Sequence, residues 1–192
     1  MADPGSGADD RLQRLEAQLS SQRDEISRLR RTIDNFIPVD VDTGLLNRNG
    51  LIESIKRAAL WWERRREPFG VLVVQIPGLS DVPMEQKHDL AMAVADTMLA
   101  TLRAVDDTGR LEETTYAAVM REFEQAGGPI VAARLRTALR VALGAIPGAG
   151  DEVRIAMSVV VEGHVREPSH YLDIAIEAAN QAHSDLPKVV ES

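Results

Sequence analysis

The chain has 192 residues, of which 44% are apolar and 27% are charged, a composition typical of one globular domain with some additional length. It has no cysteine, which excludes a disulfide framework, a thiolate metal site and a cysteine nucleophile. Its net charge of −8 and its short apolar runs lead us to expect a cytoplasmic protein that binds no nucleic acid and spans no membrane. The first ten residues, 1–10, are rich in Gly, Ala and Asp, and we expect them to be disordered.

Residues 11–37 contain a heptad seam, in which the spacing alternates between three and four. Its members are apolar except for one glutamine: Leu12, Leu15, Leu19, Gln22, Ile26, Leu29, Ile33 and Phe36. β-branched residues at a positions with leucine at d positions favour a parallel two-stranded coiled coil, so we expect a homodimer. A helix of another protein is an alternative partner. A single helix folded back on its own domain is a further alternative, although a stripe of two residues in seven is narrow for globular packing.

Helices and strands alternate after Pro38, which ends the heptad segment because the residue before a proline disfavours helix. The expected elements in chain order are a helix at 51–66, a strand at 69–76, a helix at 83–105, strands at 108–111 and 116–123, a helix at 126–143, a strand at 153–162 and a helix at 168–183. The hairpin in the middle of this order predicts an α/β fold with a mixed central sheet flanked by helices, not a doubly wound parallel sheet. Residues 188–192 are expected to form a tail.

Three segments resemble the GGDEF family of diguanylate cyclases. The segment Asp42-Thr43-Gly44-Leu45-Leu46-Asn47-Arg48, in which Thr43-Gly44 predicts a turn and Asn47 a helix cap, is similar to the family's opening signature D-x-x-T-G-L-x-N-R. Residues 102–111 are similar to the L-R-x-x-D-x-x-x-R-L that precedes the family's pentad, and residues 175–183 are similar to its late helix. The resemblance spans about Val39 to Val189 and implies that residues 38–187 form a GGDEF-like domain.

In the register of this resemblance, the pentad falls on Glu112-Glu113-Thr114-Thr115-Tyr116. The resemblance implies that an active cyclase holds two metal ions with an aspartate at the end of the first strand and with the pentad's glutamate. Here these two positions are Gln75 and Thr115, and neither carries the charge that hard divalent cations prefer. We therefore expect a degenerate domain that is not an enzyme and has no catalytic residues.

The other nucleotide-binding positions of the family have also changed. Its guanine-reading asparagine falls on Pro83, the companion aspartate falls on His88 or, with a slip of one residue, on Asp89, and the late phosphate-contacting lysine falls on His183. The four histidines of the chain lack the i,i+4 spacing of a metal site. We expect neither a metal ion nor a cofactor.

One motif of the family remains, because Arg103-x-x-Asp106 lies six residues before the pentad position. The resemblance implies that this is the family's inhibitory cyclic di-GMP site, with Arg134 near its supporting arginine. An arginine fork can bond a guanine edge or a phosphate with two hydrogen bonds. The alternative is purely structural, with an arginine at a helix end followed by an aspartate that opens a turn.

An aromatic and basic stretch, Trp61-Trp62-Glu63 followed by Arg64–Arg66, allows two interpretations. Trp62 is in step with Ile55 and is expected in the core, whereas Trp61 is expected to be partly exposed and could belong to an interface. The arginines would then be explained by the helix dipole, which favours cations in a last turn.

These observations predict a non-catalytic signalling or scaffold protein that dimerises through its coiled coil and acts through a protein partner. The alternative is a receptor that binds cyclic di-GMP through Arg103, Asp106 and Arg134. An active cyclase is the third hypothesis.

Overall fold

The computed structural model describes residues 11, 15, 18–22, 25, 37–123, 125–160, 167–182 and 188–191. The chain divides into two units, Met1–Ile37 and Pro38–Ser192. In the first unit the described residues before Ile37 are helical and exposed, including Leu15, Leu19 and Gln22 of the heptad seam. The expected disorder of residues 1–10 lies outside the described residues, as do the other seam positions, which are Leu12, Ile26, Leu29, Ile33 and Phe36. The coiled coil therefore stays a prediction.

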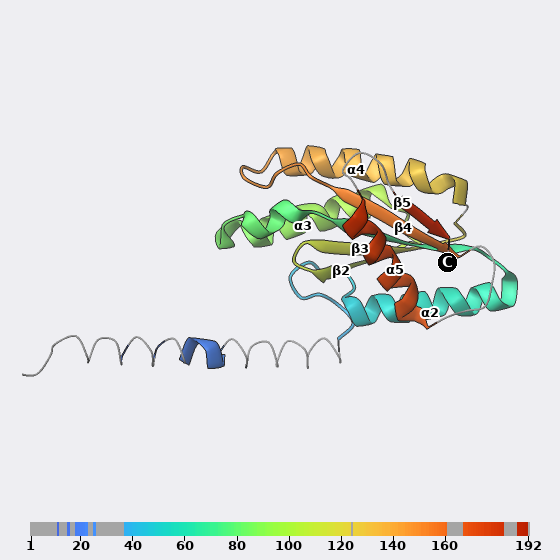
Figure 1. Ribbon diagram of the computed structural model, residues 1–192, viewed down its shortest axis with the longest axis horizontal. Coiled ribbons are helices and arrows are strands. Elements are labelled where there is room, and N and C mark those ends of the chain that lie inside the picture. Colours follow the sequence, from blue (N-terminus) through green and yellow to red (C-terminus); the bar gives the residue numbers. More distant parts are fainter. Residues whose placement is uncertain are drawn as a thin grey trace, which may run out of the picture. The chain divides into compact units, whose positions relative to one another are not determined.

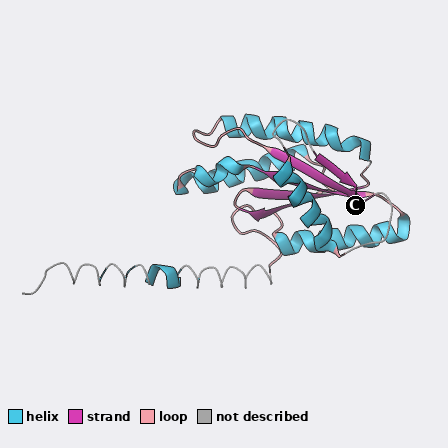
Figure 2. Cartoon of the chain, viewed as in Figure 1, coloured by secondary structure: helices cyan, strands magenta, loops and turns pink. Residues whose placement is uncertain are grey.

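The second unit is built on a five-stranded mixed sheet in the order β2-β3-β1-β4-β5 (Figures 1 and 2). The central strand β1 pairs antiparallel with β3 and β4, β2 pairs antiparallel with β3, and β5 pairs parallel with β4. In sheet order the strands are β2 (Asp107–Glu112), β3 (Thr115–Arg121), β1 (Phe69–Gln75), β4 (Arg154–Val160) and β5 (Lys188–Glu191). The predicted mixed sheet, with a hairpin in the middle of the element order along the chain, is confirmed.

Strand β5 is a correction to the sequence analysis, which placed residues 188–192 in a tail. Lys188–Glu191 instead pairs with residues 156–159 of β4. A four-residue strand with only two apolar members carries too short a pattern to be distinguished from a tail, and its state is decided by the sheet edge that it meets.

Helices cover both faces of the sheet, as Figure 1 shows. Helices α3 (Met84–Thr101) and α4 (Gly128–Gly144) pack on one face, and α2 (Arg48–Arg65) and α5 (Pro168–Gln181) pack on the other. Because successive strand residues point to opposite faces, the apolar run of β1 serves both cores: Leu72 and Val74 face α3 and α4, whereas Val71 and Val73 face α2 and α5. Among the described residues, no helix combines the length and apolarity needed to cross a membrane.

Helix α2 begins where Asn47 caps it, which confirms the predicted cap. The Asn47 Oδ1 accepts a hydrogen bond from the Gly50 N–H at 3.0 Å, and this bond satisfies one of the free donors of the first turn. The helix therefore starts at Arg48, three residues earlier than its apolar face suggests. It ends at Arg66, whose backbone has a φ of 57° and whose N–H donates to the Trp62 carbonyl.

The loop before α2 is joined to strand β2 at a close backbone approach. The Leu46 N–H donates to the Thr108 carbonyl at 3.0 Å, and the Arg110 N–H donates to the Leu46 carbonyl at 2.8 Å. Gly109 lies between these bonds. A Cβ atom there would lie 2.7 Å from the Leu46 carbonyl oxygen and would overlap the side chain of Leu51. Position 109 thus requires glycine because a larger side chain would not fit, and not because of its φ angle.

We expect Gly109→Ala to destabilise the domain by about 1–3 kcal/mol, the usual cost of forcing one extra carbon into a packed site. Gly144→Ala is the matched control, because a Cβ atom at Gly144 would meet nothing within 4 Å. Urea unfolding of both variants checks this difference. Equal midpoints for the two variants would contradict the close approach at Gly109.

Candidate functional site

The two positions assigned to metal ligands by the resemblance lie opposite each other in the sheet. Gln75 ends β1, Thr115 begins β3, and the two residues are paired in the β1–β3 ladder. The side chain of Thr115 is buried. Gln75 Nε2 donates to Asn180 Oδ1 of α5 at 2.7 Å, which ties this side chain to the helix beside it. The structure therefore brings together two neutral side chains at this end of the ladder.

The β2–β3 turn next to this pair is held by contacts within the domain. The Ile76 N–H, just after β1, donates to the carbonyl of Thr114 at 2.9 Å. The carboxylate of Glu113 forms an ion pair with Lys87 of α3. The side chain that replaces the pentad's second glycine thus has a partner of its own.

The other positions where the resemblance places nucleotide-binding residues bring no cluster of ligating side chains together among the described residues. Pro83 precedes the first residue of α3 and makes no side-chain cap, and His88 and Asp89 are exposed on that helix. His183 lies outside the described residues. Within the described part of the chain, no group of three or more His, Asp or Glu side chains is placed to hold a metal ion.

The residues of the remaining motif meet at the other end of the sheet. Arg103, Asp106 and Arg134 line one pocket of about 310 Å³, together with Arg121 and Glu122 at the end of β3. Arg103 and Asp106 come from the connection between α3 and β2, and Arg134 comes from α4. Arg134 Nη2 donates to the carbonyl of Thr101 at 2.7 Å, which anchors the guanidinium at the C-terminus of α3. The three predicted residues thus line the same pocket.

One carboxylate oxygen of Asp106 accepts a hydrogen bond within the turn, and the other accepts no hydrogen bond from the described residues. Its Oδ2 accepts from the Arg103 N–H at 2.9 Å and its own N–H donates to the Arg103 carbonyl, so the motif also makes the turn of the structural alternative. Its Oδ1 is buried and has no hydrogen-bond partner among the described residues. Burial raises the pKa of Asp106, and the backbone N–H and charge of Arg103, together with the backbone N–H of Arg121, only partly offset this. A buried acceptor without a donor is costly, and a ligand donor would relieve that cost.

The neighbouring Asp107 has the opposite electrostatic character. Its Oδ2 accepts from the Ser54 hydroxyl, from Arg121 Nη2 at 2.8 Å and from Arg57 Nη2 at 3.4 Å. Burial alone would raise the pKa of Asp107, but the Ser54 hydrogen bond and the two guanidinium groups outweigh burial and lower it. This cluster ties α2, β2 and β3 together and positions Arg121 at the pocket wall. Sequence reasoning missed it, because nothing in the spacing links residues 54, 107 and 121.

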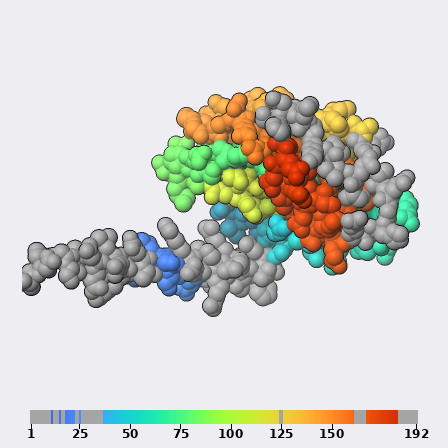
Figure 3. Space-filling model, in the orientation of Figure 1, coloured from blue at the N-terminus to red at the C-terminus, as the bar shows by residue number. Residues whose placement is uncertain are grey.

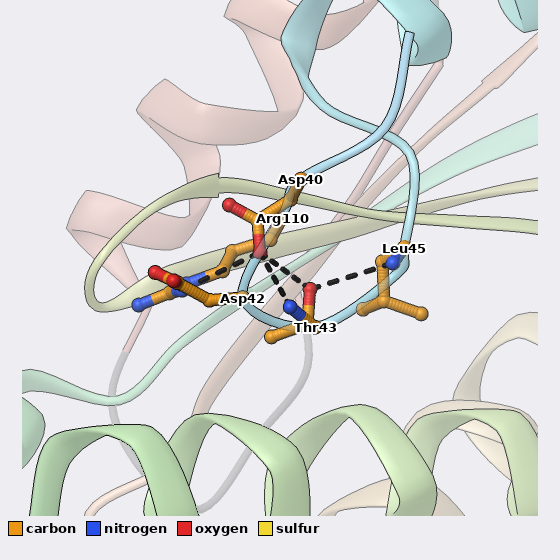
Figure 4. A network of polar contacts seen from close by, with 5 residues as sticks. All are labelled: Asp40, Asp42, Thr43, Leu45 and Arg110. Carbon is orange, nitrogen blue, oxygen red and sulfur yellow. Dashed lines mark hydrogen bonds and ion pairs between the residues drawn. The ribbon is translucent and has the colours of Figure 1, made fainter. Parts of the chain in front are cut away.

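A second polar network, shown in Figure 4, holds the opening loop. Asp40 Oδ1 accepts from the Thr43 N–H at 2.9 Å and the Thr43 hydroxyl at 2.6 Å, and it lies 3.5 Å from Arg110 Nη1. Asp42 also pairs with Arg110, at 3.3 Å. The first aspartate of the D-x-x-T signature is therefore Asp40, which precedes the segment quoted in the sequence analysis. These contacts join the opening loop to β2.

Comparison with known proteins gives no matching family model and no matching curated protein. Solved structures do match. The diguanylate cyclase SiaD from Pseudomonas aeruginosa, solved with its activator SiaC, is 19% identical with a TM-score of 0.65, over 97% of this chain and 75% of that chain. The coiled coil and GGDEF domain of DgcB from Caulobacter crescentus, in complex with c-di-GMP, is 18% identical with a TM-score of 0.63, over 93% and 99% of the two chains. At these identities the similarity establishes the fold.

Proposed function

We propose that this chain, which has the fold of GGDEF domains, is a non-catalytic signalling protein that acts by binding a protein partner. The pairing of Gln75 with Thr115 carries the proposal, because these neutral residues occupy both positions where the resemblance implies metal-binding carboxylates. Phosphoryl transfer needs cations that neutralise charge on the triphosphate, and hard divalent cations need anionic oxygen ligands.

The replaced glycines support the same proposal. Glu112 and Glu113 put two carboxylates where the resemblance implies a backbone that approaches the triphosphate, and like charges repel. The ion pair with Lys87 neutralises only Glu113. SiaD was solved with a protein activator, so at least one protein of this fold has a protein partner.

With GTP and Mg²⁺ or Mn²⁺, the purified chain is expected to form no cyclic di-GMP, because the paired residues Gln75 and Thr115 at the end of the β1–β3 ladder carry no charge. Chromatography of the nucleotide products checks this, with an active diguanylate cyclase as the positive control. Metal-dependent product that increases in proportion to the added chain would contradict the proposal.

The pocket formed by Arg103, Asp106 and Arg134 favours a second function, a receptor for cyclic di-GMP. Two guanidinium groups can bond guanine acceptors or phosphate oxygens, and the free Oδ1 of Asp106 can accept from the N–H groups of guanine. DgcB from Caulobacter crescentus, which shares this fold, was solved with c-di-GMP bound.

If the chain is this receptor, Arg103→Ala should weaken cyclic di-GMP binding by roughly ten-fold to more than a hundred-fold, the worth of a charged hydrogen bond of about 1.5–3 kcal/mol. Isothermal titration calorimetry measures the affinity. Arg48→Ala is the control, since Arg48 is exposed and pairs with Asp173 of α5 outside the pocket. Binding that survives Arg103→Ala would place the ligand elsewhere, and no binding by the wild-type chain would reject the receptor.

We also propose that residues 11–37 join two chains in a parallel coiled coil. Leu15 and Leu19, two described members of the seam, are helical and 51% and 54% exposed in the single chain, as a seam that awaits a second helix would be. The solved DgcB fragment also contains a coiled coil.

Replacing Leu15 and Leu19 together by aspartate should convert the dimer to a monomer, because charges in the seam cannot be buried. Sedimentation equilibrium measures the mass, and circular dichroism confirms that the domain stays folded. A double variant that keeps the dimer mass would show that another surface drives assembly.

A further inference from the structure

The C-terminal half of α2 carries an exposed surface. It lies outside the expected nucleotide site at Gln75 and Thr115 and outside the pocket lined by Arg103, Asp106 and Arg134. Leu60 and Trp61 are 48% and 43% exposed. A hollow of about 250 Å³ lies around them and is lined by Arg57, Leu60, Trp61, Arg64 and Arg65, which we call the Trp61 hollow. Helix α2 lies at the surface of the domain, beside α5 (Figure 3). Each lining residue is either an arginine or a large apolar side chain.

The two consecutive tryptophans of α2 have separate roles. Trp62 is 6% exposed and packs in the core that contains Ile55, which confirms the sequence prediction for both tryptophans. Neighbouring helix residues point about 100° apart, so a helix that buries Trp62 turns Trp61 away from that core. The guanidinium of Arg65 stacks over the Trp61 ring at 4.2 Å from its centroid, which holds the ring in place without covering it from solvent.

The charges of the hollow are only partly neutralised. Arg57 lies 3.4 Å from Asp107 and Arg65 lies 3.7 Å from Glu67, but no ion pair or hydrogen bond of the Arg64 side chain is found within the described part of the chain. Among the residues that the structure describes, no carboxylate lines the hollow itself. The helix dipole explains arginines in the last turn, where each stabilises the helix by about 0.3–1 kcal/mol. It does not explain the exposed leucine and tryptophan that precede them. In a chain with a net charge of −8, this is a local basic and apolar site.

We propose that the Trp61 hollow binds an acidic segment of a partner protein, which inserts an apolar or aromatic side chain beside Trp61 while its carboxylates meet Arg57 and Arg64. Tryptophan and arginine contribute most often to the affinity of protein interfaces, and charge complementarity sets the choice of partner. A contact between this hollow and the same hollow of a second copy is disfavoured, because the described lining residues offer its arginines no anionic partner. The inference rests on the proposed function and supplies the surface and partner chemistry for it.

The test pans a phage library of random 12-residue peptides against the full-length chain and measures the enriched peptides by fluorescence anisotropy. Enriched sequences should be acidic and contain an aromatic or leucine residue. Trp61→Ala and Arg64→Glu should each weaken their binding at least ten-fold. Lys56→Glu, which makes the same charge change at an exposed position of the same helix, should alter it less than two-fold. Binding should also weaken as salt is raised from 0.05 to 0.5 M, because exposed charges are then screened.

Failure to enrich acidic peptides would overturn the proposal, and so would peptides whose affinity is unchanged by Arg64→Glu. A single-stranded oligo(dT) that displaces the peptides, and that is itself lost from Trp61→Ala, would overturn it in favour of a nucleic-acid surface. Cyclase activity in the GTP assay would contradict the non-catalytic function without changing the peptide result, so the two failures can be told apart.

Discussion

The β1–β3 ladder sets the position of both sites in this domain. It runs through seven residue pairs, from Phe69 and Arg121 at one end to Gln75 and Thr115 at the other. At about 3.3 Å per residue, the two ends are separated by roughly 20 Å. Because β1 is buried on both faces, a slip by one residue would move each of its side chains into the opposite core, whose packing they do not match, so this register is strongly fixed. The residues at the expected nucleotide site therefore lie at one end of the strands. The pocket lined by Arg103, Asp106 and Arg134 and the surroundings of Trp61 lie towards the other end.

The two ends differ in their chemistry. At the Gln75 end, Gln75 is hydrogen-bonded to Asn180 and Glu113 is paired with Lys87. At the Arg121 end, two consecutive aspartates have opposite pKa shifts. Asp107 is held ionised by its donors and stabilises the junction of three elements, whereas Asp106 keeps a buried oxygen without a donor. A buried acceptor without a hydrogen bond is a place where a ligand donor can bind, and Asp106 supplies one at this end of the strands.

Much of the fold followed from local signals. Pro38 and Asn47 marked the start of the domain and of α2, and the apolar run of β1 and the hairpin after it indicated a mixed sheet. The meeting of Arg103, Asp106 and Arg134 followed from the resemblance. The roles of Asp40, Asp107 and Arg121 could not be predicted, because each depends on contacts between segments that only the strand register brings together. Strand β5 was missed because an edge pairing, and not its own short pattern, makes it a strand.

Electron paramagnetic resonance of Mn²⁺ in the presence of GTP tests the loss of the metal site most directly, since it detects the ion itself and does not depend on turnover. With Gln75 and Thr115 at the two ligand positions, the chain should leave the spectrum of the Mn²⁺–GTP complex unchanged at any protein concentration. Stoichiometric, protein-dependent broadening of that spectrum would show that a metal-bound nucleotide is held, and it would contradict a non-catalytic GGDEF fold.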